Sequence, residues 1–149
     1  MKQEDLAWFA GFIDGEGTIS VNQQDIKRGP FLQAKVTISN TNVPTLRHLE
    51  ELLQNSELPF YVDWKTNASN FGERKPLWRI TFAGLKRVNK ILSLVVPYLV
   101  TKREQGELTL KFVKSRLNIN SEKGSRNPYS EEEIKTASAV RELNRKSHH

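Results

Sequence analysis

Four short stretches in which apolar and polar residues alternate constrain the fold of this chain more than any other feature. The clearest is Phe31–Ser39, and the others are 18–24, 60–65 and 77–82. A period of two places successive side chains on opposite sides of a β-strand, so each stretch predicts a strand with one buried face. Four such strands can form one antiparallel sheet with helices packed on a single face.

Apolar residues at helical spacing fill the segments between and after these strands. Asn42 is a favoured residue type before the first turn of a helix, and Ser130 with Glu133 has the spacing of a capping box. The order predicts an α+β fold: an α-β-β-α-β-β-α core with a four-stranded antiparallel sheet, helices on one face, and two C-terminal helices. Helices are predicted at 3–15, after Asn42, at 85–96, at about 101–118 and at about 130–146.

The same pattern predicts the domain organisation. We expect one domain over residues 1–149, with a core at about 4–118 and a C-terminal helical extension at about 119–149. The polar segment 66–75 is expected to be the loop between the third and fourth strands. A chain of 149 residues is long enough to bury a core without disulfides or metal ions as supports.

The composition excludes several kinds of protein. The chain has no cysteine, so it has no disulfide framework, no thiolate metal site and no cysteine nucleophile. It contains no apolar run near the roughly 20 residues that a membrane span needs, and no signal-peptide pattern. We therefore expect no membrane partner. These features assign no compartment, because a prokaryotic cytoplasmic protein and an organelle-encoded protein would share them.

The net charge of +6 is concentrated in one part of the chain. Residues 74–118 contain 11 lysines and arginines against two glutamates, which gives that segment a net charge of +9. A concentrated basic stretch is typical of proteins that bind a polyanion such as nucleic acid. A solvated, lysine-rich helix surface would have the same composition, so the charge alone leaves both interpretations open.

The polar sides of the four strands would together form the uncovered face of the sheet. Amide, hydroxyl and basic side chains supply charge for phosphates together with donors and acceptors for base edges. An ordinary sheet with one wetted side would also alternate, but here three bases stand against one acid, Asp63, which favours nucleic acid. The predicted DNA-binding residues are Ser20, Asn22, Gln24, Gln33, Lys35, Thr37, Ser39, Lys65, Arg79 and Thr81.

The first predicted helix has a stripe that is almost bare of side chains. Small residues recur there every fourth position, at Ala7, Gly11 and Gly15, with Ala10 beside them. A glycine inside a helix costs roughly 1 kcal/mol relative to alanine, so the stripe needs a packing reason. A second copy of the same helix across a twofold axis would supply one. We therefore expect a homodimer whose interface includes Ala7, Ala10, Gly11 and Asp14.

The segment from Phe9 to Gly17, with the sequence FAGFIDGEG, resembles the LAGLIDADG motif of homing endonucleases. Phe9 stands at the first position of the motif, and Glu16 is its second acid. In that family an α-β-β-α-β-β-α core carries a curved, saddle-shaped sheet that lies in the DNA major groove, and chains with one motif dimerise. The resemblance therefore implies a homodimer acting on double-stranded DNA with a long pseudo-palindromic site, cut to leave 3′ overhangs.

The resemblance also implies a metal site. Glu16 from each subunit, with the backbone carbonyl of Gly15, would bind Mg²⁺, and Mn²⁺ or Ca²⁺ would replace it for binding. Carboxylates and carbonyls are the hard oxygen ligands that Mg²⁺ prefers, and such cations activate water for phosphodiester hydrolysis. Outside the motif Glu16 would be read as a turn carboxylate. For Asp14, a hydrogen-bonding role at the helix end is favoured over metal binding.

Two further catalytic residues are carried over from the family with an alternative for each. Asn40 stands just after the second strand, where members order water near the scissile phosphate, although a plain turn asparagine would look the same. Lys102 stands where members carry an active-site lysine, although a surface lysine in a first helical turn is the alternative. The family's arginine early in the next helix has no equivalent, because Pro44 and Thr45 occupy that place and Arg47 matches only loosely.

Two other functions remain open from the sequence. A non-catalytic or maturase-type nucleic-acid-binding protein could use the same fold, and an unrelated basic α+β interaction domain would need no active site. Loss of both motif acids would favour the non-catalytic alternative, but Asp14 and Glu16 are both present. The sequence therefore favours a Mg²⁺-dependent DNA endonuclease.

Overall fold

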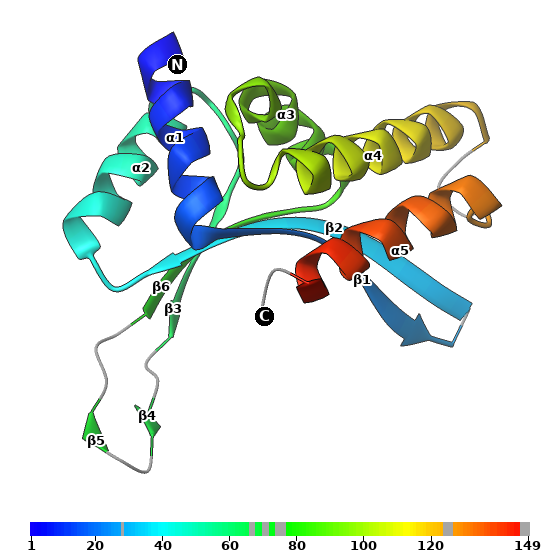
Figure 1. Ribbon diagram of the computed structural model, residues 1–149, viewed down its shortest axis with the longest axis horizontal. Helices are drawn as coiled ribbons and strands as arrows, with labels where there is room; N and C mark the ends of the chain where they lie inside the picture. Colours follow the sequence, from blue (N-terminus) through cyan, green and yellow to red (C-terminus); the bar gives the residue numbers. More distant parts are fainter. Residues whose placement is uncertain (28, 66–67, 70–71, 74–76, 124–126, 147–149) are drawn as a thin grey trace.

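The computed structural model describes residues 1–27, 29–65, 68–69, 72–73, 77–123 and 127–146. Within these residues the protein has a curved four-stranded sheet with its helices on one side, as predicted (Figure 1). None of the helices in these ranges is long and apolar enough to cross a membrane.

The first helix, α1 (Gln3–Glu16), leads directly into the first strand, β1 (Gly17–Ile26). The helix, which was predicted to end at residue 15, continues to Glu16, and the backbone leaves the helical conformation only at Gly17. A Cβ on Gly17 would lie 2.9 Å from both the Cα and the carbonyl oxygen of Ile13. Glycine is therefore the residue that permits this junction without a loop.

The sheet has the strand order β1-β2-β6-β3, and every pair is antiparallel. Its other strands are β2 (Gly29–Asn40), β3 (Tyr61–Lys65) and β6 (Leu77–Ala83). Alternate residues of β2 are buried beneath the helices, which confirms the predicted register. Two short strands, β4 (Ala68–Ser69) and β5 (Gly72–Glu73), pair with each other where a loop was predicted. Their polar sequence carries no alternation that would have revealed them.

The β1–β2 ribbon extends beyond the rest of the sheet (Figure 1). In the described residues β6 pairs with Lys35–Asn40, so the first half of β2 has β1 as its strand neighbour. Gly29 and Pro30 both belong to β2, and Gly29 pairs with Ile26 at the end of the ribbon. Gly29 has a φ of +112°, a value that favours glycine. Proline is tolerated next to it because β2 has a strand partner on only one edge there.

Four more helices complete the fold: α2 (Val43–Asn55), α3 (Leu85–Val95), α4 (Arg103–Lys123) and α5 (Glu131–Lys146), with a 3₁₀ turn at Val96–Tyr98 between α3 and α4. The predicted cap at Asn42 is confirmed, since its side chain accepts the Thr45 N–H at 3.0 Å. The capping box of α5 is also confirmed by reciprocal bonds between Ser130 and Glu133. The α4 helix continues to Lys123, beyond the predicted end at about 118.

A continuous apolar core lies between the sheet and the helices, and it includes Ala137 and Val140 of α5. Next to it, Arg116 of α4 forms a buried ion pair with Glu133 of α5 at 3.2 Å, with side chains 5% and 2% exposed. Arg116 also donates to the carbonyls of Asn127 and Pro128. The C-terminal helix is therefore attached to α4 by both apolar and ionic contacts.

Candidate active site and nucleic-acid interface

The C-terminal end of α1 carries the principal candidate for catalysis. Glu16 is the last residue of α1, and its side chain is exposed. The Gly17 junction turns the chain into β1 directly after this carboxylate, so Glu16 stands where the helix meets the sheet. The last carbonyls of a helix carry a partial negative charge, which favours cations at this end.

Asp14 joins this helix end to the segment before α4. One of its carboxylate oxygens accepts the Val100 N–H at 2.8 Å, and the other accepts the Lys102 N–H at 2.9 Å. The ammonium of Lys102 donates in turn to the Asp14 carbonyl. Both Asp14 oxygens are thus used within the chain, which favours its hydrogen-bonding role. The structure brings Asp14, Glu16 and Lys102 together at one end of α1.

Sequence reasoning assigned no role to Val100, although the structure places it at this site. Its backbone is bound by Asp14, and its side chain is 82% exposed. The sequence carries no signal for this role, because the exposure of Val100 is visible only in the folded chain.

Asn40 lies at the end of β2, where its amide oxygen accepts the Asn42 N–H at 2.8 Å. The register pairs Gly17 with Ile38, so Asn40 is two residues further along the strand, or about 7 Å. The asparagine is therefore near the α1–β1 junction, while its oxygen closes the turn before α2. Both interpretations of Asn40 from the sequence are compatible with this position.

The described part of a single chain contains no complete metal site. Among the residues that the structure describes, no three His, Cys, Asp or Glu side chains form a group that could hold an ion. Glu16 is an exposed carboxylate beside helix-end carbonyls, which suits a hard cation. Such cations take about six or more oxygen ligands, so further ligands would have to come from a second chain, DNA or water.

The bare stripe of α1 faces away from the body of the chain. Ala7, Gly11 and Gly15 are exposed, and a Cβ added to Gly11 or Gly15 would have no described heavy atom within 4 Å apart from the neighbouring residues and nearby backbone of α1. Ala10 differs from the prediction, because it is 0% exposed and packs in the core of its own chain. The bare stripe therefore consists of Ala7, Gly11 and Gly15.

The predicted DNA-binding positions occupy one face of the sheet, opposite the helices. The register sets Asn22 against Gln33 and Ser39 against Arg79, and it continues this pairing of polar positions across the sheet. Asn22 and Gln24 are exposed, whereas Ser20, Gln33, Lys35, Thr37, Ser39 and Arg79 are half-buried.

Thr81 and Lys65 differ from the other predicted positions. Thr81 is only 7% exposed, because it lies in the middle of the sheet between Thr37 and Tyr61. It is therefore less accessible to a ligand than predicted. Lys65 belongs to β3, but its side chain lies outside the described part of the structure.

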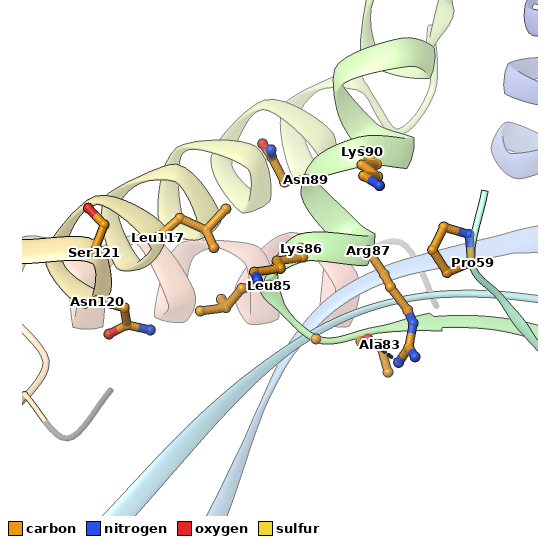
Figure 2. Close-up of a pocket in the computed structure, with 11 residues that line it drawn as sticks. Pro59, Ala83, Leu85, Lys86, Arg87, Asn89, Lys90, Leu117, Asn120 and Ser121 are labelled. Atoms are coloured by element: carbon orange, nitrogen blue, oxygen red, sulfur yellow. Dashed lines mark hydrogen bonds between the residues drawn. The ribbon is translucent and has the colours of Figure 1, made fainter. Parts of the chain in front are cut away.

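A separate hollow lies between α3 and α4 on the helical side, with a volume of about 960 Å³. Figure 2 shows Lys86, Arg87 and Lys90 of α3 on one wall and Leu117 and Asn120 of α4 on the other. None of the described residues that line it is acidic, and none is a predicted catalytic residue. The hollow is therefore a feature distinct from the end of α1.

No protein-family model and no curated protein sequence matches this chain. Solved structures of homing endonucleases match its fold. I-CvuI, in complex with the I-CreI target, has a TM-score of 0.59 and 20% identity over 99% of this chain and 96% of that chain. The archaeal intron-encoded I-Vdi141I, complexed with DNA, has a TM-score of 0.60 and 16% identity over 97% and 99%.

The meganuclease I-SmaMI, bound to an uncleaved DNA target with calcium ions, has a TM-score of 0.65 at 16% identity. That match covers 95% of this chain but 45% of the I-SmaMI chain. The chain therefore has the fold of the LAGLIDADG homing endonucleases, as the motif predicted.

Proposed function

We propose that this chain is a site-specific, double-strand DNA endonuclease of the homing type, active as a homodimer with divalent cations held between the two Glu16 side chains. One observation carries the proposal: an exposed acid ends a helix whose bare stripe is uncovered, next to Lys102. The fold shared with DNA-bound homing endonucleases supports it.

The homodimer follows from the stripe formed by Ala7, Gly11 and Gly15. Two copies of α1 could approach closely along it, because neither glycine places atoms between them. The twofold axis would then bring the two Glu16 carboxylates together, so that each chain supplies part of a shared catalytic site.

The chemistry assigned to this site is phosphodiester hydrolysis. Glu16 and the Gly15 carbonyl would hold Mg²⁺, which supplies an activated water and neutralises charge on the leaving oxygen. Lys102 is kept at the helix end by Asp14, where its ammonium would lower the cost of negative charge on the phosphate. Asn40 would hydrogen-bond to water beside the phosphate. Two such centres would cut the two strands at staggered positions and leave 3′ overhangs.

The polar sheet face is proposed to read the DNA sequence. The 12 residues of β2 span about 37 Å, and a duplex rises about 3.4 Å per base pair. One subunit could therefore follow about 11 base pairs, and a symmetric dimer would recognise a long pseudo-palindromic site. Lys35 and Arg79 would contribute charge, while Asn22, Gln24 and Gln33 would supply amides for base edges.

The test is cleavage of a random duplex library with Mg²⁺, with Ca²⁺ or with a chelator. We expect the wild-type protein to cut selected sequences only with Mg²⁺, and Glu16→Gln to bind the same sequences without cutting them. Glu51→Gln, which removes an exposed carboxylate from α2, should cut normally. Normal cutting by Glu16→Gln would overturn the catalytic assignment. Sequence-specific binding without cutting by the wild-type protein would establish the non-catalytic alternative instead.

A further inference from the structure

The outer half of β2 has a hydrogen-bonding edge that β6 does not reach. The Gly84 N–H donates to the Ala34 carbonyl at 3.4 Å, directly after the last residue of β6. Backbone groups alternate between the two edges of a strand, so Leu32 is the next residue that faces this edge. Leu32 therefore lies where a longer β6 would have formed its next pair of hydrogen bonds.

The hydroxyl of Tyr129 takes the place of that missing strand residue. It accepts the Leu32 N–H at 2.9 Å and donates to the Leu32 carbonyl at 3.4 Å. A phenol hydroxyl can donate and accept at once, so one side chain satisfies both backbone groups of Leu32. The contact joins residues 97 positions apart in the sequence, and connects the C-terminal segment to the ribbon.

Tyr129 is itself held firmly. Its ring stacks on Phe112 of α4, with the ring centroids 6.2 Å apart. The guanidinium of Arg116 lies 4.5 Å from the centre of the same ring, and the buried ion pair with Glu133 fixes that arginine. The hydroxyl therefore reaches β2 from a rigid support.

A second contact from the same C-terminal segment reaches the neighbouring strand. The side-chain amide of Asn144 in α5 donates to the Ile19 carbonyl of β1 at 2.8 Å. Ile19 pairs with Val36, whose backbone faces β6, so the Ile19 carbonyl faces the outer edge of the sheet. The C-terminal segment thus binds the backbone of the ribbon on both of its edges.

We propose that Tyr129 is a positioning residue for DNA specificity: its hydroxyl fixes the outer half of the β1–β2 ribbon, where Asn22, Gln24 and Gln33 lie. The proposal rests on the function proposed above, in which this face reads base edges. The inner half is held by β6, whereas a two-stranded ribbon alone is only marginally stable. Side chains that read bases need a fixed backbone, so the hydroxyl would matter for the outer base pairs of each half-site.

The test is Tyr129→Phe, which keeps the ring and its contacts but removes the hydroxyl. In the free protein, hydrogen exchange at the Leu32 amide should become at least about tenfold faster, while Val36 stays unchanged. In cleavage profiling over all single-base variants, discrimination at the outer base pairs should fall about fivefold to tenfold. Discrimination at the central pairs, and the cleavage rate on the best site at saturating enzyme, should stay at wild-type values. Tyr98→Phe, in the 3₁₀ turn, is the matched control and should change none of these.

Three outcomes would decide against the proposal. An unchanged Leu32 exchange rate would show that the hydroxyl does not hold the ribbon. A specificity profile that is unchanged, or weakened equally at all positions, would refute the positioning role even if exchange becomes faster. A wild-type protein that binds no duplex would refute the proposed function, and with it the specificity role, whatever the exchange rates are. On a shortened duplex that lacks the outer base pairs, Tyr129→Phe and wild type should bind equally.

Discussion

Gly11→Leu should have opposite effects on the single chain and on the homodimer. Gly11 is exposed on α1, and a Cβ there would have no described heavy atom within 4 Å apart from the neighbouring residues and nearby backbone of α1. The isolated chain can therefore accept the larger side chain without displacing its own atoms. Because leucine is the better helix former, the free energy of unfolding of the monomer should rise by about 0.5–1 kcal/mol.

The dimer should be weakened by a larger amount. Overpacking in a close contact typically costs about 1–3 kcal/mol, and a twofold interface would contain the new side chain twice. The loss of about 2–6 kcal/mol corresponds to a rise in the dimer dissociation constant of about thirtyfold to twenty-thousandfold. Cleavage should fall in parallel at low protein concentration, since each subunit supplies one Glu16.

Sedimentation velocity over a range of protein concentrations measures the dissociation constant, and chemical denaturation at the lowest concentration measures the stability of the monomer. Glu51→Leu is the control, because it adds the same side chain to an exposed position of α2. A Gly11→Leu protein that dimerises like the wild type would show that the stripe is not the interface. A monomer that is clearly destabilised would contradict the open surface around Gly11.

Four further substitutions test other parts of the structure. Asp14→Asn cannot accept both N–H groups, so the free energy of unfolding should fall by about 1–3 kcal/mol. Its single-turnover cleavage rate should fall more than its DNA affinity, which paired rapid-quench and binding measurements would detect. Gly17→Ala should lower the unfolding free energy by about 1–3 kcal/mol, because its Cβ would meet the Ile13 backbone; an unchanged melting temperature would contradict this. Arg79→Ala should alter the cleavage profile at particular base pairs while Ile80→Gln unfolds the protein, and the reverse result would mean that the wrong sheet face was assigned to DNA.

The sequence was sufficient to predict the order of the elements and the strand register. The alternation in 31–39 determines which residues of β2 face the core, because a shift by one residue would expose all of its apolar side chains. Helix starts at Asn42 and Ser130 were predictable for a similar reason, since each cap is made by residues within three positions. These features depend on local chemistry, which is readable without the fold.

The features that were missed depend on contacts between distant segments or on how deeply a residue is buried. The bond from Tyr129 to Leu32 and the bonds from Asp14 to the start of α4 join segments more than 80 residues apart, and no local pattern encodes them. Alternation predicted the face on which Thr81 lies but not its burial, which depends on neighbours from two other strands. Ala10 was predicted at the dimer interface but is buried in the core of its own chain, because small residues look alike in sequence, whether they leave room for another chain or fit within their own core.

The absence of a loop between α1 and β1 has a consequence for any attempt to redirect this protein to new targets. Because β1 begins at the residue that follows Glu16, a backbone change that twists β1 would also change the orientation of Glu16. Exchanging exposed side chains of β1 leaves the backbone at this junction unchanged, and such variants should keep the position proposed for Glu16 in catalysis. Inserting even one flexible residue between positions 16 and 17 would separate the orientation of Glu16 from that of β1. Such a protein should still bind its DNA target but should no longer cleave it.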